Sequence, residues 1–274
     1  MASGGLGSDP PFAFASKAWT SARMKAVELT KVLRQRDPQL VAALNEVRSG
    51  IVPARGATSR LFRGLSRHLP ALASGVLPTC LYSTNRNVDS ENQMALARLP
   101  GEAVVMEGKD VSDDSGALET LRKNCPVPAS MVLKPGAQVV LLRNVDDTLV
   151  NGSRGVVTGF VDKKSTEYHR HQQTSFRIHS KLAEVAEKLF PRVPLVTFDN
   201  GRILAVNAAE FSVTAGAGKF AERLQVPLKL AWALTVHKSQ GMTISRLEVN
   251  LGWGSLTDKT ANEGCSFKMN PRPP

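Results

Sequence analysis

Cysteine is scarce in this sequence, and long apolar runs are missing. The three cysteines, Cys80, Cys125 and Cys265, lie far apart, and none belongs to a Cys-x-x-Cys pair or is spaced from a histidine as metal ligands are. This pattern predicts a reducing compartment and no metal site, zinc included. No stretch approaches the roughly eighteen apolar residues of a membrane span, and residues 1–20 lack the basic-then-apolar order of a signal peptide. We therefore expect a soluble protein with no membrane partner and no readable targeting signal.

A phosphate loop is also missing. The stretch Thr214–Phe220 (TAGAGKF) contains a Gly-Lys pair, but the motif needs a glycine five positions before that pair and Ser or Thr after it. Val213 and Phe220 occupy these two positions. Because no other Gly-Lys-Ser/Thr occurs in the sequence, it holds no Walker-type cradle for a nucleoside triphosphate.

Basic residues outnumber acidic ones, with a net charge of +11 and a pI near 9.9. This balance favours polyanionic partners, although ribosomal, membrane-surface and merely soluble proteins share it. Residues 1–75 carry most of the excess, with eleven Lys or Arg against four Asp or Glu. Five arginines there are spaced along one segment, at Arg48, Arg55, Arg60, Arg63 and Arg67. They fit a phosphate-facing surface or a solvated helix face.

The first part of the chain has the pattern of an α/β fold. Asp37–Gly50 is predicted to be a helix, because its first residue can cap it, Pro38 fits the first turn and the final glycine can close it. Leu77–Thr84 has the apolar, β-favouring composition of a buried strand. Val88–Leu99 then predicts a helix that Pro100 ends, so strand, loop and helix form one α/β unit.

Short strands dominate after a connection around residues 110–130. The pair Asn200-Gly201 predicts a two-residue hairpin turn, since both residues tolerate a positive φ. Lys163–Arg192 is polar and charged, with an amphipathic piece at Leu182–Phe190, and we interpret it as an insertion on a small all-β module. The strands predicted for this module are Ala137–Leu142, Gly155–Phe160, Leu195–Phe198 and Arg202–Val206.

From Pro227 the chain is predicted to re-enter the α/β domain. Leu228–Leu234 has the pattern of a largely buried strand, and His237–Gly241 follows as a tight polar turn. Arg246–Leu251 predicts another strand. Trp253–Pro274 shows no periodicity and is predicted to be disordered.

The segment Val236–Thr243 (VHKSQGMT) gathers small donors and a glycine at the end of a buried strand, where open α/β sheets bind ligands. A phosphate backbone suits such a loop, and an ordinary strand-to-helix connection fits it as well. His237 has no nucleophile or metal ligand at useful spacing nearby, which favours a hydrogen-bonding over a catalytic histidine. Lys238 is interpreted as solvated or phosphate-facing, and Trp232 as a core residue rather than a base-stacking platform.

Arg34-Gln35 comes directly before the predicted helix Asp37–Gly50. An arginine at a strand-to-helix junction can bind a phosphate with two parallel hydrogen bonds. The residues by themselves favour a surface arginine instead.

Five segments together resemble one known family in their order and spacing. They are Phe12–Trp19 (FAFASKAW), Glu28–Asp37 (ELTKVLRQRD), Tyr82–Asp89 (YSTNRNVD) with Asn92, Leu133–Asn144 (LKPGAQVVLLRN) with Leu149–Phe160 (LVNGSRGVVTGF), and Pro227–Thr243 (PLKLAWALTVHKSQGMT). They resemble the Pif (petite integration frequency) family of superfamily-one DNA helicases, and the last segment is similar to helicase motif five almost residue for residue. The resemblance spans about residues 12–252 and is weakest at 51–77 and 161–192.

The resemblance implies an α/β fold, in which a RecA-like second helicase domain of the phosphate-loop NTPase type is interrupted by a small Src-homology-three-like β-barrel insertion. The expected division is a disordered N-terminus at 1–11, the first part of the RecA-like domain at 12–130, the barrel at 131–226, the return with motif five at 227–252, and a divergent disordered tail at 253–274.

The resemblance also implies roles for single residues. In the family, two RecA-like domains clamp ATP between them and move along single-stranded DNA from its five-prime end. By the motif match, Arg34 and Gln35 would face the γ-phosphate, while Gln240 and Gly241 would bind the nucleotide where hydrolysis is coupled to DNA grip. The residues implied to bind DNA are Thr84, Asn85, Asn92, Thr235, His237, Lys238 and Ser239.

ATP and Mg²⁺ are the cofactors that the resemblance implies, and single-stranded or forked DNA is the implied partner. It further implies a role in replication, repair, recombination or telomere maintenance, in the nucleus or the mitochondrion. Phe12–Trp19 resembles the run that leaves the first motor domain, and the rest of that domain has no counterpart in the sequence. The last helicase motif, whose arginine stabilises charge in phosphoryl transfer, has none either. We therefore expect a chain that is inactive as an isolated ATPase, with a missing or separate first helicase domain as partner.

Two alternatives stay open from the sequence. One is a non-catalytic module that binds single-stranded nucleic acid through its basic N-terminal stretch and the HKSQG loop. The other is a fragment that folds only beside its missing domain, because its domain interface is exposed.

Overall fold

A computed structural model describes residues 12–28, 32, 37–50, 56, 58, 72–172, 176, 178–215, 219–240, 242, 244, 246–250 and 266–269. The chain divides into two units, Met1–Arg63 and Gly64–Pro274, and each is described by itself. Among the described residues, no helix combines the length and the apolar character of a membrane span.

In its described residues the first unit forms a 3-10 turn, η1 (Ala13–Ala15), and the helices α1 (Lys17–Ser21) and α2 (Pro38–Arg48). The helix predicted at Asp37–Gly50 is confirmed as α2. The Asp37 carboxylate accepts hydrogen bonds from the first free backbone N–H groups of the helix, at 2.9 and 3.3 Å. Gly50 follows the helix with φ +70°, a conformation that glycine adopts without strain.

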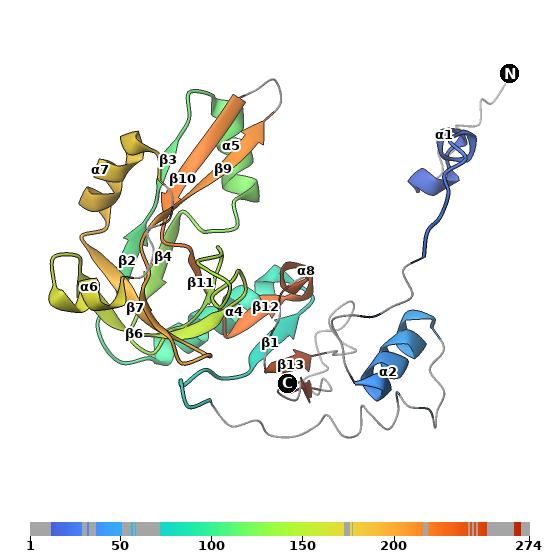
Figure 1. The fold of residues 1–274 in the computed structure, drawn as a ribbon, viewed down its shortest axis with the longest axis horizontal. Coiled ribbons are helices and arrows are strands. Elements are labelled where there is room, and N and C mark those ends of the chain that lie inside the picture. Colours follow the sequence, from blue (N-terminus) through green and yellow to red (C-terminus); the bar gives the residue numbers. More distant parts are fainter. Residues whose placement is uncertain are drawn as a thin grey trace, which may run out of the picture. The chain divides into compact units, whose positions relative to one another are not determined.

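A parallel sheet is the centre of the second unit's α/β part. Strand β1 (Thr79–Tyr82) pairs in parallel with β12 (Ala233–Thr235) on one side and β13 (Leu247–Asn250) on the other. Helix α4 (Asn85–Arg98) packs on β1 and β12, as Figure 1 shows. Residues far apart in the sequence therefore form one layer.

The predictions for this sheet hold with two changes. The predicted strands Leu77–Thr84 and Arg246–Leu251 are confirmed as β1 and β13. The predicted helix Val88–Leu99 exists but begins three residues earlier, because Asn85 already forms part of its first turn. Strand β14 (Ser266–Met269) pairs antiparallel with β13, so the prediction of a disordered tail is wrong at these four residues. Hydrogen bonds to a preformed strand edge stabilise a segment that has no periodicity of its own.

The β module contains a five-stranded sheet in the order β11-β5-β6-β7-β8. Its two edge strands do not pair with each other within the described part of the chain, so the predicted closed barrel is not seen there. A hairpin forms at Asn200-Gly201, but the predicted two-residue turn is wrong. The loop between Phe198 and Arg202 has three residues, and of these only Gly201 has a positive φ, +85°. The strands are β5 (Gln138–Leu141), β6 (Arg154–Asp162), β7 (Arg192–Phe198), β8 (Ile203–Ala205) and β11 (Leu228–Leu230).

Two helices lie between β6 and β7, where the sequence predicts an insertion. They are α6 (Thr166–His171) and α7 (Ser180–Leu189), and the second confirms the amphipathic piece predicted at Leu182–Phe190. Leu182, Ala186 and Phe190 are buried on one face. The spacing of these apolar residues places them on the same side of the helix, against the β module.

A second group of strands was not predicted. Strands β3 (Lys109–Val111), β10 (Lys219–Gln225) and β9 (Ala209–Ala215) form a sheet on which helix α5 (Ser115–Asn124) packs. Strands β2 (Val104–Glu107) and β4 (Ser130–Leu133) form a separate pair. The connection noted around residues 110–130 thus contains helix α5, which Asp114 caps by accepting from the Ala117 N–H at 2.8 Å. The described residues of the rejected phosphate-loop stretch pair across β9 and β10, Thr214 with Phe220 and Ala215 with Lys219.

The strand predicted at Leu228–Leu234 is two strands in two sheets. Strand β11 pairs with β5 in the β module, whereas β12 pairs with β1 in the parallel sheet. The chain crosses at Ala231, whose carbonyl accepts hydrogen bonds from the Gln138 side chain and from Thr79 Oγ1, at 2.9 and 3.0 Å. The return to the parallel sheet thus takes place between Leu230 and Ala233 rather than at Pro227.

Buried polar side chains join the β module to the parallel sheet. Gln138 lies on β5 and binds the backbone of Leu77 through both its amide oxygen and its amide nitrogen. Arg154 lies on β6, is 1% exposed, and donates to Thr79 Oγ1 at 2.9 Å and to the Arg246 carbonyl at 3.1 Å. Because a buried polar group is costly without its partners, these contacts hold the two sheets in one arrangement.

Candidate nucleic-acid interface

Two polar segments leave the same edge of the parallel sheet. Tyr82 of β1 stands opposite Thr235 of β12 in a parallel register, so both strands end together. Helix α4 begins directly after β1, and the one-turn helix α8 (Val236–Ser239) begins directly after β12 (Figure 1). Ligands of open α/β sheets bind at this carboxyl edge.

The loop after β12 is shaped by its own side chains. Thr235 is buried, and its hydroxyl accepts from the Lys238 N–H at 3.3 Å, which caps α8. The Ser239 hydroxyl donates to the Val236 carbonyl at 2.8 Å. His237, Lys238 and Gln240 are exposed, so the predicted polar turn is a single helical turn that presents these three side chains to solvent.

The start of helix α4 is exposed to solvent, at the same edge of the parallel sheet as the loop after β12. Thr84 stands at the N-cap position without a side-chain capping bond, and both Thr84 and Asn85 are exposed. The first N–H groups of a helix have no partner within the helix, and they favour anions.

Asn92 was expected to bind DNA, but the structure buries it. The side chain is 4% exposed. Its amide nitrogen donates to the Ala233 carbonyl, and its amide oxygen accepts from the Ala233 N–H, both at 3.0 Å. The amide is therefore engaged in fastening α4 to β12, and it positions the edge rather than reaching a ligand.

Lys229 on β11 is a residue that the sequence reasoning missed. Burial, together with the charge and the hydrogen bond of Lys238, lowers its pKa to about 8, whereas Asp89 acts in the opposite direction. The sequence feature that could have revealed this residue is a single lysine inside the apolar run Pro227–Leu234. Two ammonium groups this close repel each other, and an anion between them relieves the repulsion.

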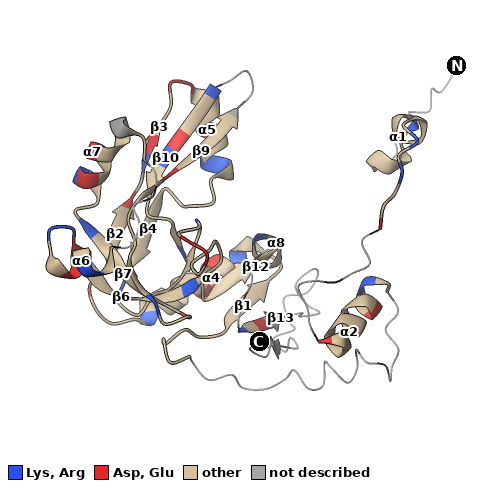
Figure 2. Cartoon of the chain, viewed as in Figure 1, with Lys and Arg blue, Asp and Glu red and all other residues tan. Residues whose placement is uncertain are grey.

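A small cavity of about 190 Å³ opens beside Lys229, between α4, β4 and β11. The side chains around it include Asp89, Gln93 and Ser130. Basic positions at α8 are coloured blue in Figure 2, close to this part of the chain. The edge therefore combines the positive charge of Lys229 and Lys238 with amide and hydroxyl groups, beside the carboxylate of Asp89. Ammonium, amide and hydroxyl groups are those that bind a phosphate backbone.

The low pKa of Lys229 makes the stability of the protein depend on pH. Between pH of about 8 and 10.5 the unfolded chain holds a proton that folded Lys229 has lost, so this residue makes the free energy of unfolding rise as pH increases. The variant Lys229→Met should lack this rise. Urea unfolding of both proteins at several pH values across this interval checks it, and parallel curves would contradict the assignment.

A glycine of the β module packs against the residues that follow the loop after β12. Gly152, in the turn before β6, has φ +99°, and a Cβ atom there would lie 3.1 Å from the side chain of Met242. Met242 follows the HKSQG segment and packs with the cluster of Leu81, Val140, Ala231 and Leu234. The glycine is needed both for its backbone conformation and for this close approach.

Three of the predicted site residues cannot be placed. Arg34, Gln35 and Gly241 lie outside the described residues. Of the residues predicted to face the nucleotide, only Gln240 is described, and it is exposed after α8. The described edge thus brings together Thr84, Asn85, His237, Lys238 and Ser239, with Asn92 and Thr235 buried beneath them.

Known proteins match this chain over most of its length. The family model described as "DNA helicase Pif1, 2B domain" matches residues 117–160. The ATP-dependent DNA helicase PIF1 of Emericella nidulans is 34% identical over 267 residues, and the human protein of the same name is 35% identical over 255 residues. The chain belongs to the Pif family of helicases.

The Pif relatives are longer than this chain. The matches cover 88% and 90% of the chain but 35% and 34% of the two relatives, so the chain spans about a third of their length. The crystal structure of Pif1 helicase from Candida albicans gives a TM-score of 0.62 at 34% identity, over 87% of this chain and 53% of that one. Bacteroides Pif1 in complex with ADP-AlF4 gives 0.57 at 22% identity, over 83% and 46%, and shows the shared fold alone. The mixed α/β fold thus matches Pif helicase structures.

Proposed function

We propose that this chain is the second motor half of a Pif-type ATP-dependent DNA helicase, and that it binds single-stranded DNA at the edge of its parallel sheet. The observation that carries the proposal is the convergence of two exposed polar segments, after β1 and after β12, beside the pair of Lys229 and Lys238. The names of the relatives, ATP-dependent DNA helicases, support DNA as the ligand.

The fold assignment within this proposal is RecA-like. The parallel order β12-β1-β13 with α4 on one face supports it. We assign the β module to the accessory domain of the family, as an open counterpart of the Src-homology-three-like barrel expected from the sequence. The match of residues 117–160 to the Pif1 2B domain supports this assignment.

The edge residues divide into those that contact DNA and those that support the edge. Thr84, Asn85, His237 and Ser239 contact the sugar–phosphate backbone as hydrogen-bonding groups. Lys238 and Lys229 contribute charge, and such contacts fix the register of a strand without reading its sequence. Thr235 and Asn92 hold these residues in place, because both are buried and hydrogen-bonded within the protein.

Nucleotide hydrolysis in this proposal requires a first motor domain from elsewhere. Arg34 and Gln35 are assigned to the γ-phosphate, and Gln240 and Gly241 are assigned to nucleotide binding where hydrolysis is coupled to DNA grip. The sequence has no phosphate loop, so this chain by itself does not fit Mg²⁺–ATP and no hydrolytic step is assigned to it. The proposal includes a role in replication, repair, recombination or telomere maintenance, in the nucleus or mitochondrion. This part rests on the family alone.

A titration with single-stranded DNA tests the proposal. Fluorescently labelled DNA is titrated with the purified chain at low and moderate salt, with and without ATP and Mg²⁺, while phosphate release is followed. We expect binding that weakens as salt rises, because displaced counterions are released, and no phosphate release. DNA binding without salt dependence would contradict the phosphate-backbone contacts, and ATP-dependent phosphate release would contradict the need for a first motor domain.

The same experiment includes a control for folding. A cooperative thermal unfolding transition shows that the chain folds without its partner domain. Broad, non-cooperative melting together with absent DNA binding would instead favour a fragment that folds only beside that domain. A chain that melts cooperatively, binds DNA and ignores ATP is the expected half-motor.

A further inference from the structure

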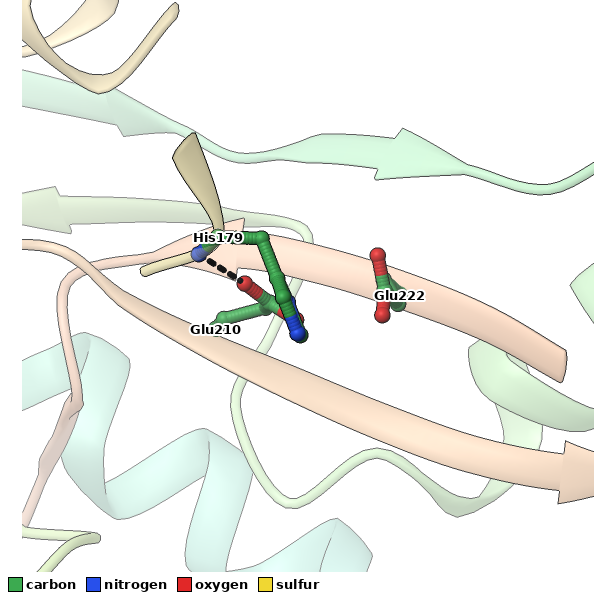
Figure 3. A group of neighbouring side chains, drawn as sticks. All are labelled: His179, Glu210 and Glu222. Carbon is green, nitrogen blue, oxygen red and sulfur yellow. Dashed lines mark hydrogen bonds and ion pairs between the residues drawn. The ribbon is translucent and has the colours of Figure 1, made fainter. Parts of the chain in front are cut away.

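Three metal-ligating side chains gather in the β module, away from the nucleic-acid interface. They are His179, Glu210 and Glu222, and one ligand atom of each lies within 4.8 Å of those of the other two. Figure 3 shows them converging from three elements, the start of α7, strand β9 and strand β10. Nothing in the proposed DNA or nucleotide binding uses them.

The register of the β9–β10 pair brings the two glutamates together. Glu210 stands opposite Leu224, and Glu222 stands opposite Ser212. Side chains of directly opposed residues share a face, and so do residues two apart along a strand, so Glu210 and Glu222 are diagonal neighbours on one face. Because they are twelve positions apart in the sequence, no local sequence pattern indicates that they are neighbours.

His179 and Glu210 are already oriented toward each other. The His179 backbone N–H donates to Glu210 Oε2 at 3.0 Å, and His179 Nδ1 lies 2.7 Å from Glu210 Oε1. Arg143 donates to the Glu210 backbone carbonyl, which fixes the strand at this position. Because the Glu210 side chain is buried at 8% exposure, its carboxylate keeps one position. A metal ion bound there would replace the proton between His179 Nδ1 and Glu210 Oε1.

The cluster is open to solvent on the side of the histidine. The His179 side chain is 77% exposed, so an ion can enter and keep water ligands there. Two carboxylates side by side repel each other, and a divalent cation between them relieves that repulsion. Zinc accepts three protein ligands with one coordination position left open.

We propose that His179, Glu210 and Glu222 bind a divalent transition-metal ion such as Zn²⁺, which fastens the start of α7 to the β9–β10 hairpin. One imidazole nitrogen and two carboxylate oxygens suit zinc and its first-row neighbours, whereas Mg²⁺ prefers oxygen ligands alone and keeps its water shell. The sequence predicted no metal site, because these ligands lie on three separate elements and show no ligand spacing along the chain.

Calorimetric titration with zinc chloride tests this proposal on the whole chain after treatment with a chelator. We expect one Zn²⁺ per chain, and Mg²⁺ that fails to compete. The variant Glu222→Gln keeps the size of the side chain but loses the charge, and it should raise the Kd for Zn²⁺ by more than about tenfold. The matched control is Glu184→Gln, at an exposed position on α7, which should bind like the parent.

Thermal unfolding provides the second readout. Zn²⁺ should raise the unfolding temperature of the parent and of Glu184→Gln, but not of Glu222→Gln. If the metal-free Glu222→Gln protein melts lower than the parent, His179→Gln takes its place, since it keeps the backbone N–H that binds Glu210. Zinc binding of unchanged affinity in both ligand variants would overturn the proposal and leave an ion pair and hydrogen-bonded cluster only.

Discussion

Replacing Lys229 and Lys238 together by methionine is expected to weaken binding of single-stranded DNA by about tenfold or more. A hydrogen bond to a charged group contributes about 1.5–3 kcal/mol, and both ammonium groups lie at the edge where the phosphates are proposed to bind. The plot of log Kobs against log salt should also lose about 0.7 of slope for each phosphate contact removed from a single strand. Fluorescence titrations at several salt concentrations measure both quantities.

The matched control for the double variant combines Lys164→Met and Lys188→Met, which remove two exposed lysines of the insertion between β6 and β7. It lowers the net charge without touching the edge of the parallel sheet. The titrations are run at about pH 7, where Lys229 with its pKa of about 8 is still protonated. A control variant that loses as much affinity as the double variant would mean that total charge, not this edge, determines binding.

Arg154→Met is expected to lower the free energy of unfolding by about 3–5 kcal/mol, because it removes one partner of a buried polar network. Burial lowers the pKa of Arg154, and Asp199 acts in the opposite direction. The substitution leaves Thr79 and the carbonyl groups of Leu77 and Arg246 without this donor. Urea unfolding followed by circular dichroism measures the difference.

Arg202→Met is the control for this second experiment. Arg202 also forms an ion pair, with Asp146 at 2.8 Å, but both side chains are partly exposed. Partly exposed pairs contribute about 0–1 kcal/mol, so this variant should unfold close to the parent. Equal unfolding curves for the Arg154 and Arg202 variants would show that the buried network does not stabilise the joint between the two sheets.

Contacts between the β module and the parallel sheet connect the β module to the edge that is proposed to bind DNA. Arg154 connects β6 with β1 and with the start of β13, and Gly152 packs against Met242 just after the HKSQG segment. Both residues belong to the β module, whose one proposed DNA contact is Lys229 on β11. A movement of the β module relative to the parallel sheet would therefore displace the residues that hold this edge in place.

Local patterns predicted the elements that carry their own signals. Asp37 and Gly50 marked the ends of α2, Asn200-Gly201 marked the β7–β8 turn, and the apolar run after Leu77 marked β1. Capping, positive φ and apolar composition act over a few residues, so they can be read without the rest of the fold. Strands β9 and β10 were missed because partly charged strands have no such local signal.

The sequence by itself determined the family, through the resemblance of five segments to Pif helicases. It also indicated the loop chemistry, because Val236–Thr243 concentrates small donors and a lysine within a few neighbouring positions. Only the tertiary structure decided which of those groups face solvent. Asn92 is buried against Ala233, Lys229 is brought beside Lys238, and His179 meets two glutamates from distant strands. These outcomes depend on strand register and on crossing between sheets, and such contacts join positions that no short-range pattern in the sequence connects.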